Sequence, residues 1–278
     1  MKYIEQNGEV EITDVSDFDL VRIFECGQCF RWDASTNGVY TGVAFGRAAR
    51  LRRDGDRIFI SGTAEEFESV WRDYFDLDRD YAEIRQRLCV DDFMNRATEF
   101  GAGIRILRQD RWEALCSFII SQCNNIPRIK KIVAALCREF GDKIEFDGKE
   151  FHTFPAAERL AELDAADLAP IRAGYRAAYI IGAAKAVVAG DIDLDELSRS
   201  TPADARAALK QLTGVGDKVA DCAVLFGLNM LDAFPLDVWM KRAVAQNYGS
   251  EFDPQIFSPY AGIAQQYMFD YIRNGKLS

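Results

Sequence analysis

The chain has 278 residues, of which 49% are hydrophobic and 28% charged, as in an ordinary globular protein of one large domain or two. It shows no signal-peptide pattern at its start and no apolar run as long as a membrane span, so we expect no membrane partner. The net charge of −10 argues at first sight against a nucleic-acid partner, since phosphates are neutralised by Lys and Arg.

The distribution of charge changes that first impression. Two segments, 114–138 and 168–190, contain no acidic residue. Their basic residues are Arg128, Lys130, Lys131 and Arg138 in the first segment, and Arg172, Arg176 and Lys185 in the second. The negative charge lies elsewhere, as in 73–92 and 191–196. We therefore expect a basic face on an otherwise acidic molecule, which suits a protein that touches DNA over a small area.

The cysteines indicate a reducing environment. They are odd in number and scattered, at positions 26, 29, 89, 116, 123, 137 and 222. This usage favours free thiols in an intracellular protein. Cys26-Gly-Gln-Cys29 has the spacing of metal ligands, but no second pair exists and the single histidine, His152, is distant in sequence. We expect neither a metal nor a cofactor.

The N-terminal part reads as strands followed by helices. Residues 8–62 contain five alternating segments (10–13, 30–32, 39–45, 49–53 and 57–61) separated by turn residues, which predicts an antiparallel sheet. Thr63-Ala-Glu-Glu has the form of a capping box, and apolar residues then recur at helical spacing. Residues 80–101 are predicted to continue as helix.

The remainder reads as helices with short connections. The predicted helices are 112–121, 127–140, 156–163, 164–171, 176–189, 202–211, 217–226, 237–248 and 259–274, and 143–154 is a short hairpin or a loop. The fold class is therefore α+β. We predict an N-terminal domain over 1–103 with the sheet, and a helical part over 104–278 with an active-site cleft between its helical subdomains.

The most informative stretch is 209–243. A helix ends, the chain turns through Thr213-Gly214-Val215-Gly216, and a second helix begins near Asp217. Two glycines one residue apart permit a tight hairpin. The free N–H groups at the start of the second helix suit a phosphate, so we expect Gly214, Val215 and Gly216 to contact the DNA backbone. Lys218 just inside that helix, and Asp237 after Pro235, suggest chemistry on the DNA sugar.

Residues 212–223 and 234–242 resemble the helix-hairpin-helix/Gly-Pro-Asp superfamily of base-excision DNA glycosylases. Gly-Val-Gly-Asp-Lys-Val-Ala-Asp-Cys, followed by Pro-Leu-Asp-Val, is most similar to the 8-oxoguanine DNA glycosylase/lyase family. The order of a strand-rich N-terminus, helical body, hairpin and aspartate extends the resemblance over nearly the whole chain. Some relatives in the superfamily carry an iron–sulfur cluster on cysteines after the aspartate, but no cysteine follows Cys222.

The resemblance makes Lys218 the nucleophile that attacks the sugar carbon and forms a Schiff base. Its amine must be neutral to attack, so we expect apolar neighbours that lower its pKa. A lysine exposed in the first turn of a helix is the alternative interpretation. Asp237 would stabilise positive charge on the sugar as the base leaves. The alternative for Asp237 is a helix N-cap, and both roles are compatible.

The resemblance also implies a pocket for the flipped base. Cys222 would pack against the base, Gln265 would bond its edge and Phe269 would stack on its other face, with Gln265 and Phe269 at i, i+4 spacing. Gly27, in Cys26-Gly-Gln-Cys-Phe-Arg-Trp32, would offer its carbonyl to the N7–H that oxidised guanine has and guanine lacks. Core packing and a plain turn glycine are the alternatives.

Further residues would act on the opposite strand. Asn124 would support the gap left by the flipped nucleotide, Tyr175 would wedge beside the orphaned base, and Arg128 and Arg176 would contact that base. Phosphate contact is the alternative for both arginines. Two positions depart from the family pattern: Cys123 replaces an asparagine of eukaryotic members, and Trp239 replaces a histidine near the lesion phosphate.

We therefore predict a bifunctional 8-oxoguanine DNA glycosylase/lyase, an intracellular monomer that acts on duplex DNA containing 8-oxoguanine. Because Cys123 departs from the family pattern, we do not expect strict selection for cytosine opposite the lesion. Two alternatives remain open at this point: a glycosylase for alkylated bases that does not nick the strand, and a non-catalytic helix-hairpin-helix DNA-binding module.

Overall fold

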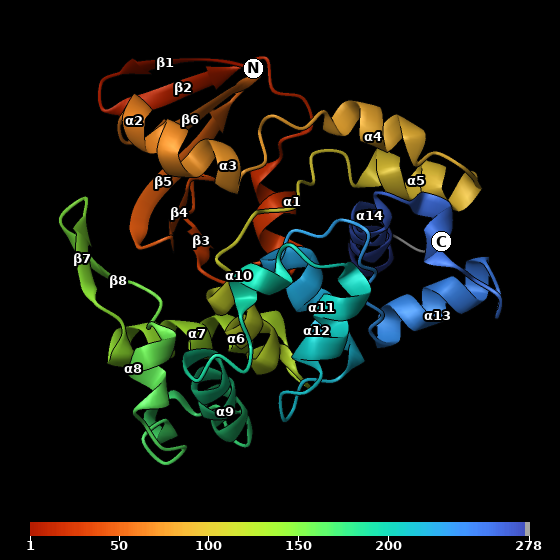
Figure 1. Ribbon diagram of the computed structural model, residues 1–278. Coiled ribbons are helices and arrows are strands. Elements are labelled where there is room, and N and C mark those ends of the chain that lie inside the picture. The colour runs from red at the N-terminus through yellow and green to blue at the C-terminus, as the bar shows by residue number, and fades with distance from the viewer. Residues whose placement is uncertain (276–278) are drawn as a thin grey trace.

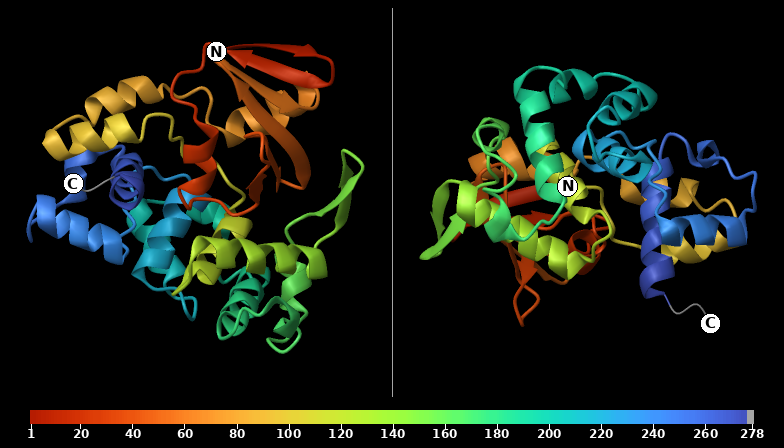
Figure 2. Two further views of the ribbon diagram at one scale, coloured as in Figure 1. Left: turned by 180° about the vertical axis from the view of Figure 1, so that it is seen from behind. Right: turned by 90° about the horizontal axis from the view of Figure 1, so that it is seen from below.

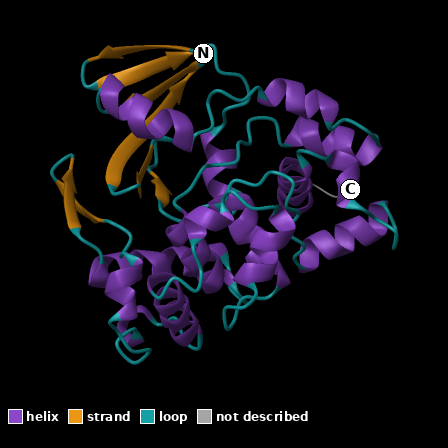
Figure 3. Cartoon of the chain, in the orientation of Figure 1, coloured by secondary structure: helices purple, strands orange, loops and turns teal. Residues whose placement is uncertain are grey.

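The structure of the protein, a computed structural model, describes residues 1–275 (Figure 1). An antiparallel sheet lies at one end of the molecule, and helices make up most of the rest (Figure 3). The sheet is drawn from the first 61 residues and the helical body follows it. The predicted α+β fold class is confirmed.

Six strands form the sheet in the order β1-β2-β6-β5-β4-β3, with all neighbours antiparallel. They are β1 (Lys2–Gln6), β2 (Glu9–Thr13), β3 (Trp32–Ala34), β4 (Tyr40–Ala44), β5 (Arg47–Asp54) and β6 (Arg57–Ser61). Val10, Ile60, Leu51 and Tyr40 pair in turn across four strands and form one buried row. The prediction missed β1, an edge strand whose Ile4 is 57% exposed, because such a strand carries no apolar alternation.

One face of the sheet is covered by a helical segment over residues 64–74. It consists of α2 (Ala64–Glu66), a π-helical turn (Phe67–Trp71) and α3 (Arg72–Tyr74). The predicted capping box at Thr63 is confirmed. A helix that was not predicted, α1 (Leu20–Glu25), packs beside it, with Phe24 stacked on Trp32 at 4.6 Å between ring centroids.

The helical body follows in chain order. Its helices are α4 (Tyr81–Arg87), α5 (Asp92–Phe100), α6 (Arg111–Ser121), α7 (Ile126–Phe140), α8 (Ala157–Ala161), α9 (Arg176–Val188), α10 (Leu194–Leu197), α11 (Pro202–Leu209), α12 (Asp217–Cys222), α13 (Val238–Asn247) and α14 (Ala261–Asn274). A hairpin of β7 (Lys143–Phe146) and β8 (Lys149–His152) projects from this body toward the sheet (Figure 1). No helix within residues 1–275 has both the length and the apolar character needed to cross a bilayer.

Two predicted helices differ from the structure. The helix expected over 80–101 is divided into α4 and α5. The helix expected over 164–171 is wrong, since only Ala169–Ile171 forms a short 3-10 turn. Pro170 lacks an N–H, and Arg172 has a φ of +55°, so neither residue continues an α-helix. The short helix α10 was not predicted.

The helices α4 and α5 belong to the larger core. The second of them, α5, packs against α14, which comes much later in the chain, as Figure 2 shows from two sides. The predicted boundary between 103 and 104 assigns these helices to the N-terminal domain, and it stays a prediction. Between the two parts lies Arg105, 1% exposed, whose guanidinium donates to the carbonyls of Ser16, Asp17 and Asp76.

Candidate active site

A tight hairpin joins α11 to α12. Gly214 has a φ of +86°, and a Cβ at this position would collide with the ring of Tyr179. The Val215 N–H donates to the Leu212 carbonyl at 3.0 Å, which closes the turn. Gly216 is the N-cap of α12 and offers no side chain to the first N–H groups of that helix. These N–H groups suit an anion such as a DNA phosphate.

Lys218 lies half-buried in the first turn of α12. Its Nζ donates to Ser121 Oγ at 3.0 Å and lies 5.2 Å from the centroid of the Phe118 ring. Both partners belong to α6, and Ser121 is itself fixed because its hydroxyl donates to the Phe118 carbonyl at 2.8 Å. The alternative of an exposed surface lysine is therefore wrong.

Asp237 lies between Pro235 and α13. Its Oδ1 accepts from the Met240 N–H at 2.7 Å, so it is the N-cap of α13. This bond confirms the N-cap interpretation and fixes the carboxylate, which is half-buried, at the edge of the same cavity as Lys218. One carboxylate oxygen is committed to the helix, while the other is available for a positive charge within the cavity.

The cavity beside Lys218 brings together residues from both ends of the chain and from the hairpin. It is lined by Cys26, Gly27, Phe118, Lys218, Cys222, Phe226, Pro235, Asp237, Gln265, Gln266 and Phe269. All six residues predicted for catalysis and base binding are in this set. Burial raises the pKa of the Cys222 thiol, which remains neutral beside Lys218.

The cavity opens into a larger groove. Gly27, Phe118, Lys218, Asp237 and Phe269 line both spaces. The cavity has a volume of about 60 Å³ and the groove about 640 Å³. An apolar cavity of about 150 Å³ takes up benzene, which is smaller than a purine. A base therefore enters only if the wall moves, and we expect half-buried Phe269, at the junction, to be the side chain that moves.

The loop that carries Gly27 is held from within. Gln28 is completely buried, and its amide donates to the carbonyls of Ile23 (2.9 Å) and Arg105 (2.8 Å) and accepts from the Leu107 N–H (2.9 Å). Gly27 has a φ of +87°, and a Cβ there would lie 3.1 Å from Ile126 Cδ1. The position therefore favours glycine for both backbone conformation and space.

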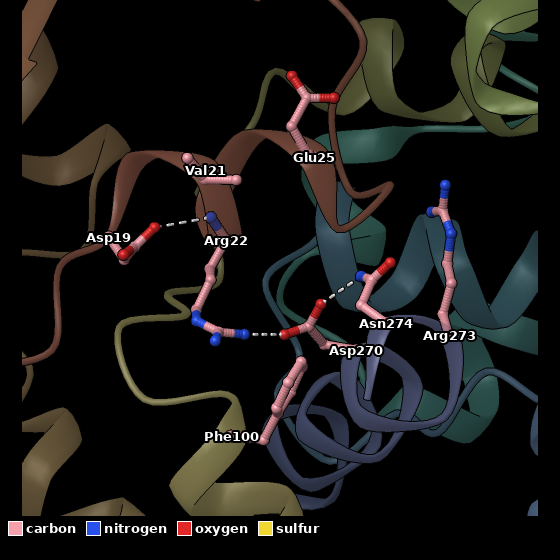
Figure 4. A pocket seen from close by; sticks show the side chains of 8 residues that line it. All are labelled: Asp19, Val21, Arg22, Glu25, Phe100, Asp270, Arg273 and Asn274. Carbon is pink, nitrogen blue, oxygen red and sulfur yellow. Dashed lines mark hydrogen bonds and ion pairs between the residues drawn. The ribbon is translucent and has the colours of Figure 1, made fainter. Parts of the chain in front are cut away.

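An ion pair behind the cavity joins α1, which leads to Gly27, to α14, which carries Gln265 and Phe269. Figure 4 shows the hollow in which Arg22 reaches Asp270. Arg22 Nη1 lies 2.5 Å from Asp270 Oδ2, and Asn274 donates to Asp270 Oδ1 at 2.7 Å. Because the Asp270 side chain is only 4% exposed, this pair is partly shielded from solvent, and it links the two elements that lead to the cavity walls.

The residues predicted for the opposite strand lie in different environments. Asn124 lines the groove and donates to the Ile120 carbonyl at 3.2 Å. Arg128 is exposed on α7, and its guanidinium has no hydrogen-bond or ion-pair partner within residues 1–275. Tyr175 is 52% exposed at the start of α9. Cys123 is exposed with a φ of +47°, a backbone conformation that asparagine tolerates better than most residues.

Arg176 is the exception, since it is only 4% exposed. Its guanidinium donates to the carbonyls of Gln122 (2.9 Å), Cys123 (3.2 Å) and Ala173 (3.2 Å), and it stacks on Tyr175 with 4.5 Å from Cζ to the ring centroid. In this structure Arg176 therefore organises the 122–124 loop. A contact with the orphaned base would require these bonds to be given up.

Comparison with known proteins decides the family. Residues 11–115 match the N-terminal domain of 8-oxoguanine DNA glycosylase, and residues 116–255 match the HhH-GPD superfamily of base excision DNA repair proteins. The chain belongs to the 8-oxoguanine DNA glycosylase family. Together the two matches cover the sheet from within β2 onward, the hairpin and Asp237, and they end before α14.

Individual relatives agree. The N-glycosylase/DNA lyase of Saccharomyces cerevisiae is 32% identical over 84% of this chain and 69% of its own length. The N-glycosylase/DNA lyase OGG1 of Arabidopsis thaliana is 32% identical over 91% of this chain and 77% of its own. A solved structure of the 8-oxoguanine glycosylase/lyase of Clostridium acetobutylicum, bound to DNA with cytosine opposite 8-oxoguanine, is 36% identical with a TM-score of 0.94, covering 100% of this chain and 99% of that one.

The basic face of this 8-oxoguanine glycosylase is smaller than the sequence predicts. Lys130 Nζ donates to Glu25 (3.2 Å) and to the Trp32 carbonyl (2.8 Å), and it lies 3.7 Å from Asp33. Acids from the N-terminal part thus neutralise a charge in a segment that has no acid of its own. Lys241 and Arg273, which the prediction did not name, line the groove instead.

Metal binding has no support in the described chain. No group of three or more His, Cys, Asp and Glu side chains in residues 1–275 lies close enough to hold an ion. Cys26 and Cys29 are buried free thiols, and burial raises the pKa of Cys26 to about 12. A metal ligand is a thiolate, so this environment disfavours the ligating form.

The sequence analysis of this glycosylase missed three residues that line the cavity or hold its parts in place. Ser121 bonds Lys218, Gln266 lines the cavity next to Gln265, and Gln28 holds the Gly27 loop. Each is an ordinary polar residue in a helix or loop of the sequence. All three lie in stretches that resemble the family, namely 26–32, 117–128 and 259–269, but no role was assigned to them.

Substitution of the two arginines predicted to contact the orphaned base is expected to change the free energy of unfolding by different amounts. Arg176→Ala leaves three loop carbonyls without their donor, so we expect the free energy of unfolding to fall by about 1–3 kcal/mol. Arg128→Ala removes an exposed side chain and is expected to change it by less than about 0.5 kcal/mol. Urea unfolding of both variants measures this, and equal stability of the two would contradict the structural role of Arg176.

Proposed function

We propose that this protein, a bifunctional 8-oxoguanine DNA glycosylase and lyase of base excision repair, uses Lys218 as its nucleophile and Asp237 as the electrostatic partner of that lysine. The observation that carries the proposal is the convergence of Lys218, Asp237 and the base-pocket residues on one cavity that opens into a groove. A DNA clamp alone has no need of such a cavity.

The first chemical step is the exchange of one bond at the sugar for another. The unprotonated Lys218 nitrogen attacks C1′ of the flipped nucleotide, and the bond from C1′ to N9 of the base breaks with its electron pair going to the base. The departing base takes up the proton that the newly bonded Lys218 nitrogen, now an ammonium, loses. Asp237 stabilises the positive charge that develops on the sugar while this bond breaks. Ser121 holds the lysine in place through the 3.0 Å bond.

The second step cleaves the strand. The lone pair of the Lys218 nitrogen breaks the C1′–O4′ bond and opens the sugar, and O4′ takes up a proton. The protonated Schiff base that results makes the C2′ proton acidic. Loss of that proton places a double bond between C2′ and C3′ and expels the 3′ phosphate. Water then releases the lysine for another turnover.

The remaining residues bind and select the DNA. In this proposal the hairpin residues Gly214, Val215 and Gly216 bind a phosphate. The base lies between Cys222 and Phe269, Gln265 bonds its edge, and the Gly27 carbonyl accepts its N7–H. An unoxidised guanine presents a lone pair there and forfeits a buried hydrogen bond.

On the opposite strand, Asn124 and Tyr175 occupy the gap, with Arg128 directed at the orphaned base or its phosphate. We further propose that the protein works as a monomer inside the cell, on chromosomal DNA in the nucleoid or nucleus. Size-exclusion chromatography with and without DNA tests the oligomeric state.

One assay tests the reaction and separates the alternatives. The protein is incubated with duplex DNA containing 8-oxoguanine in the presence of borohydride, which reduces a Schiff base to a stable bond. A covalent protein–DNA adduct is the expected result. Excision without an adduct would indicate a glycosylase that does not nick, such as one for alkylated bases. Binding without excision would indicate a DNA-binding module.

A further inference from the structure

A second glutamine in the cavity has a carbonyl oxygen without a partner. Gln266 is only 4% exposed, and its Oε1 makes no hydrogen bond within residues 1–275. Three other buried side-chain atoms share this condition, on Asn229, Asp232 and Tyr267. Gln266 is the one of the four that lines the cavity beside Lys218. A buried unpaired acceptor is costly unless a ligand supplies the missing donor.

The position of Gln266 on α14 places it next to the two predicted base-binding residues. Gln265 precedes it, and Phe269 follows at i+3, a spacing at which side chains are neighbours on a helix surface. Gln266 Nε2 donates to Gln265 Oε1 at 2.7 Å. This bond occupies the Gln265 carbonyl, so the Gln265 amide group is left to act as a donor, while Gln266 Oε1 is left to act as an acceptor.

We propose that Gln266 is a specificity-determining residue that reads the Watson–Crick edge of the flipped base together with Gln265. That edge of 8-oxoguanine presents one acceptor, O6, beside two donors, N1–H and the 2-amino group. The Gln265 amide donates to O6 and Gln266 Oε1 accepts from the adjacent N–H. Adenine presents the reverse order, an amino donor beside the N1 lone pair, and has no 2-amino group.

The inference rests on the proposed function and extends it. Gly27 is proposed to distinguish oxidised from unoxidised purine, whereas the glutamine pair distinguishes guanine from adenine. The two readouts are at opposite edges of the base. Gln266 also acts on Gln265, since loss of its Nε2 would free the Gln265 amide to rotate.

The test compares two reactions of the intact protein that share Lys218 but differ in the base. Gln266→Leu conserves approximate size and removes both polar atoms. We expect single-turnover excision of 8-oxoguanine to fall by about tenfold to a hundredfold, the effect of one unmade buried hydrogen bond. Strand cleavage at a preformed abasic site, which contains no base, is expected to stay within about twofold. Gln255→Leu, at an exposed position, is the matched control and changes neither rate.

A binding measurement separates base reading from a structural role. In a Lys218→Gln background, which leaves the base attached, the ratio of Kd values for duplexes with 8-oxoadenine and 8-oxoguanine is measured with and without Gln266→Leu. A reduction of about tenfold in the preference for 8-oxoguanine over 8-oxoadenine supports the proposal. An unchanged preference, or a parallel loss of abasic-site cleavage and thermal stability, overturns it. If the wild-type protein excises no 8-oxoguanine at all, the proposed function fails first.

Discussion

Lys218→Gln is expected to abolish the borohydride-trapped adduct and to lower strand cleavage by about 10³-fold or more, the scale of losing a covalent nucleophile. Glutamine is uncharged and ends one atom short of the lysine nitrogen, and its amide nitrogen has no reactive lone pair. The fold and the DNA affinity should therefore persist. The measurements are adduct yield on a denaturing gel, product formation under single-turnover conditions, and Kd for lesion-containing DNA.

A second lysine in the same groove provides the control. Lys241 is exposed and lines the groove on α13, so it would also meet DNA phosphates. Lys241→Gln should weaken DNA binding and reduce the change of Kd with salt concentration. The adduct should still form at saturating protein. Adduct formation that survives in Lys218→Gln and disappears in Lys241→Gln would transfer the nucleophilic role to position 241.

Asp237→Asn is expected to lower the rate of base excision by about 10²- to 10³-fold, as for other single electrostatic groups that face a developing charge. Asparagine is as good an N-cap as aspartate, so the bond to the Met240 N–H is retained and α13 stays intact. The substitution thus removes the negative charge without removing the cap. Excision by a saturating amount of protein measures the effect.

Asp253 offers a matched N-cap. It caps the short 3-10 helix Pro254–Phe257 through a bond to the Gln255 N–H at 2.9 Å, outside the cavity. Asp253→Asn should leave excision unchanged. If the two variants excise equally well, Asp237 is a cap and no more. If both lose thermal stability to the same degree but only Asp237→Asn loses activity, the electrostatic role holds.

The fold was predictable where local patterns are strong. Alternation identified five of the six strands, and the capping box and helical spacing located most of the helices. The failures have local causes as well. The edge strand β1 lacks apolar alternation, and the predicted helix over 164–171 contains Pro170. The packing of α5 on α14 joins segments that are far apart in the sequence, which no local pattern reveals.

The site was predictable where a motif fixes both residue type and spacing. Gly214, Gly216, Lys218 and Asp237 form such a motif, and the structure brings Lys218 and Asp237 to one cavity. Partners from elsewhere in the chain were not predictable. The acids that neutralise Lys130 come from the N-terminal part, and the partners of Arg176 are backbone carbonyls. A sequence contains no direct record of either kind of contact.

The ion pair between Arg22 and Asp270 spans 248 positions of the chain. The two elements that this pair joins, α1 and α14, are therefore synthesised at different times, one near the beginning of translation and one near its end. A nascent chain therefore contains the hairpin between α11 and α12 before α14, which forms one wall of the cavity, has been synthesised. Loss of α14 would remove fully buried Ile263, Tyr267 and Met268 from the larger core together with one wall of the cavity.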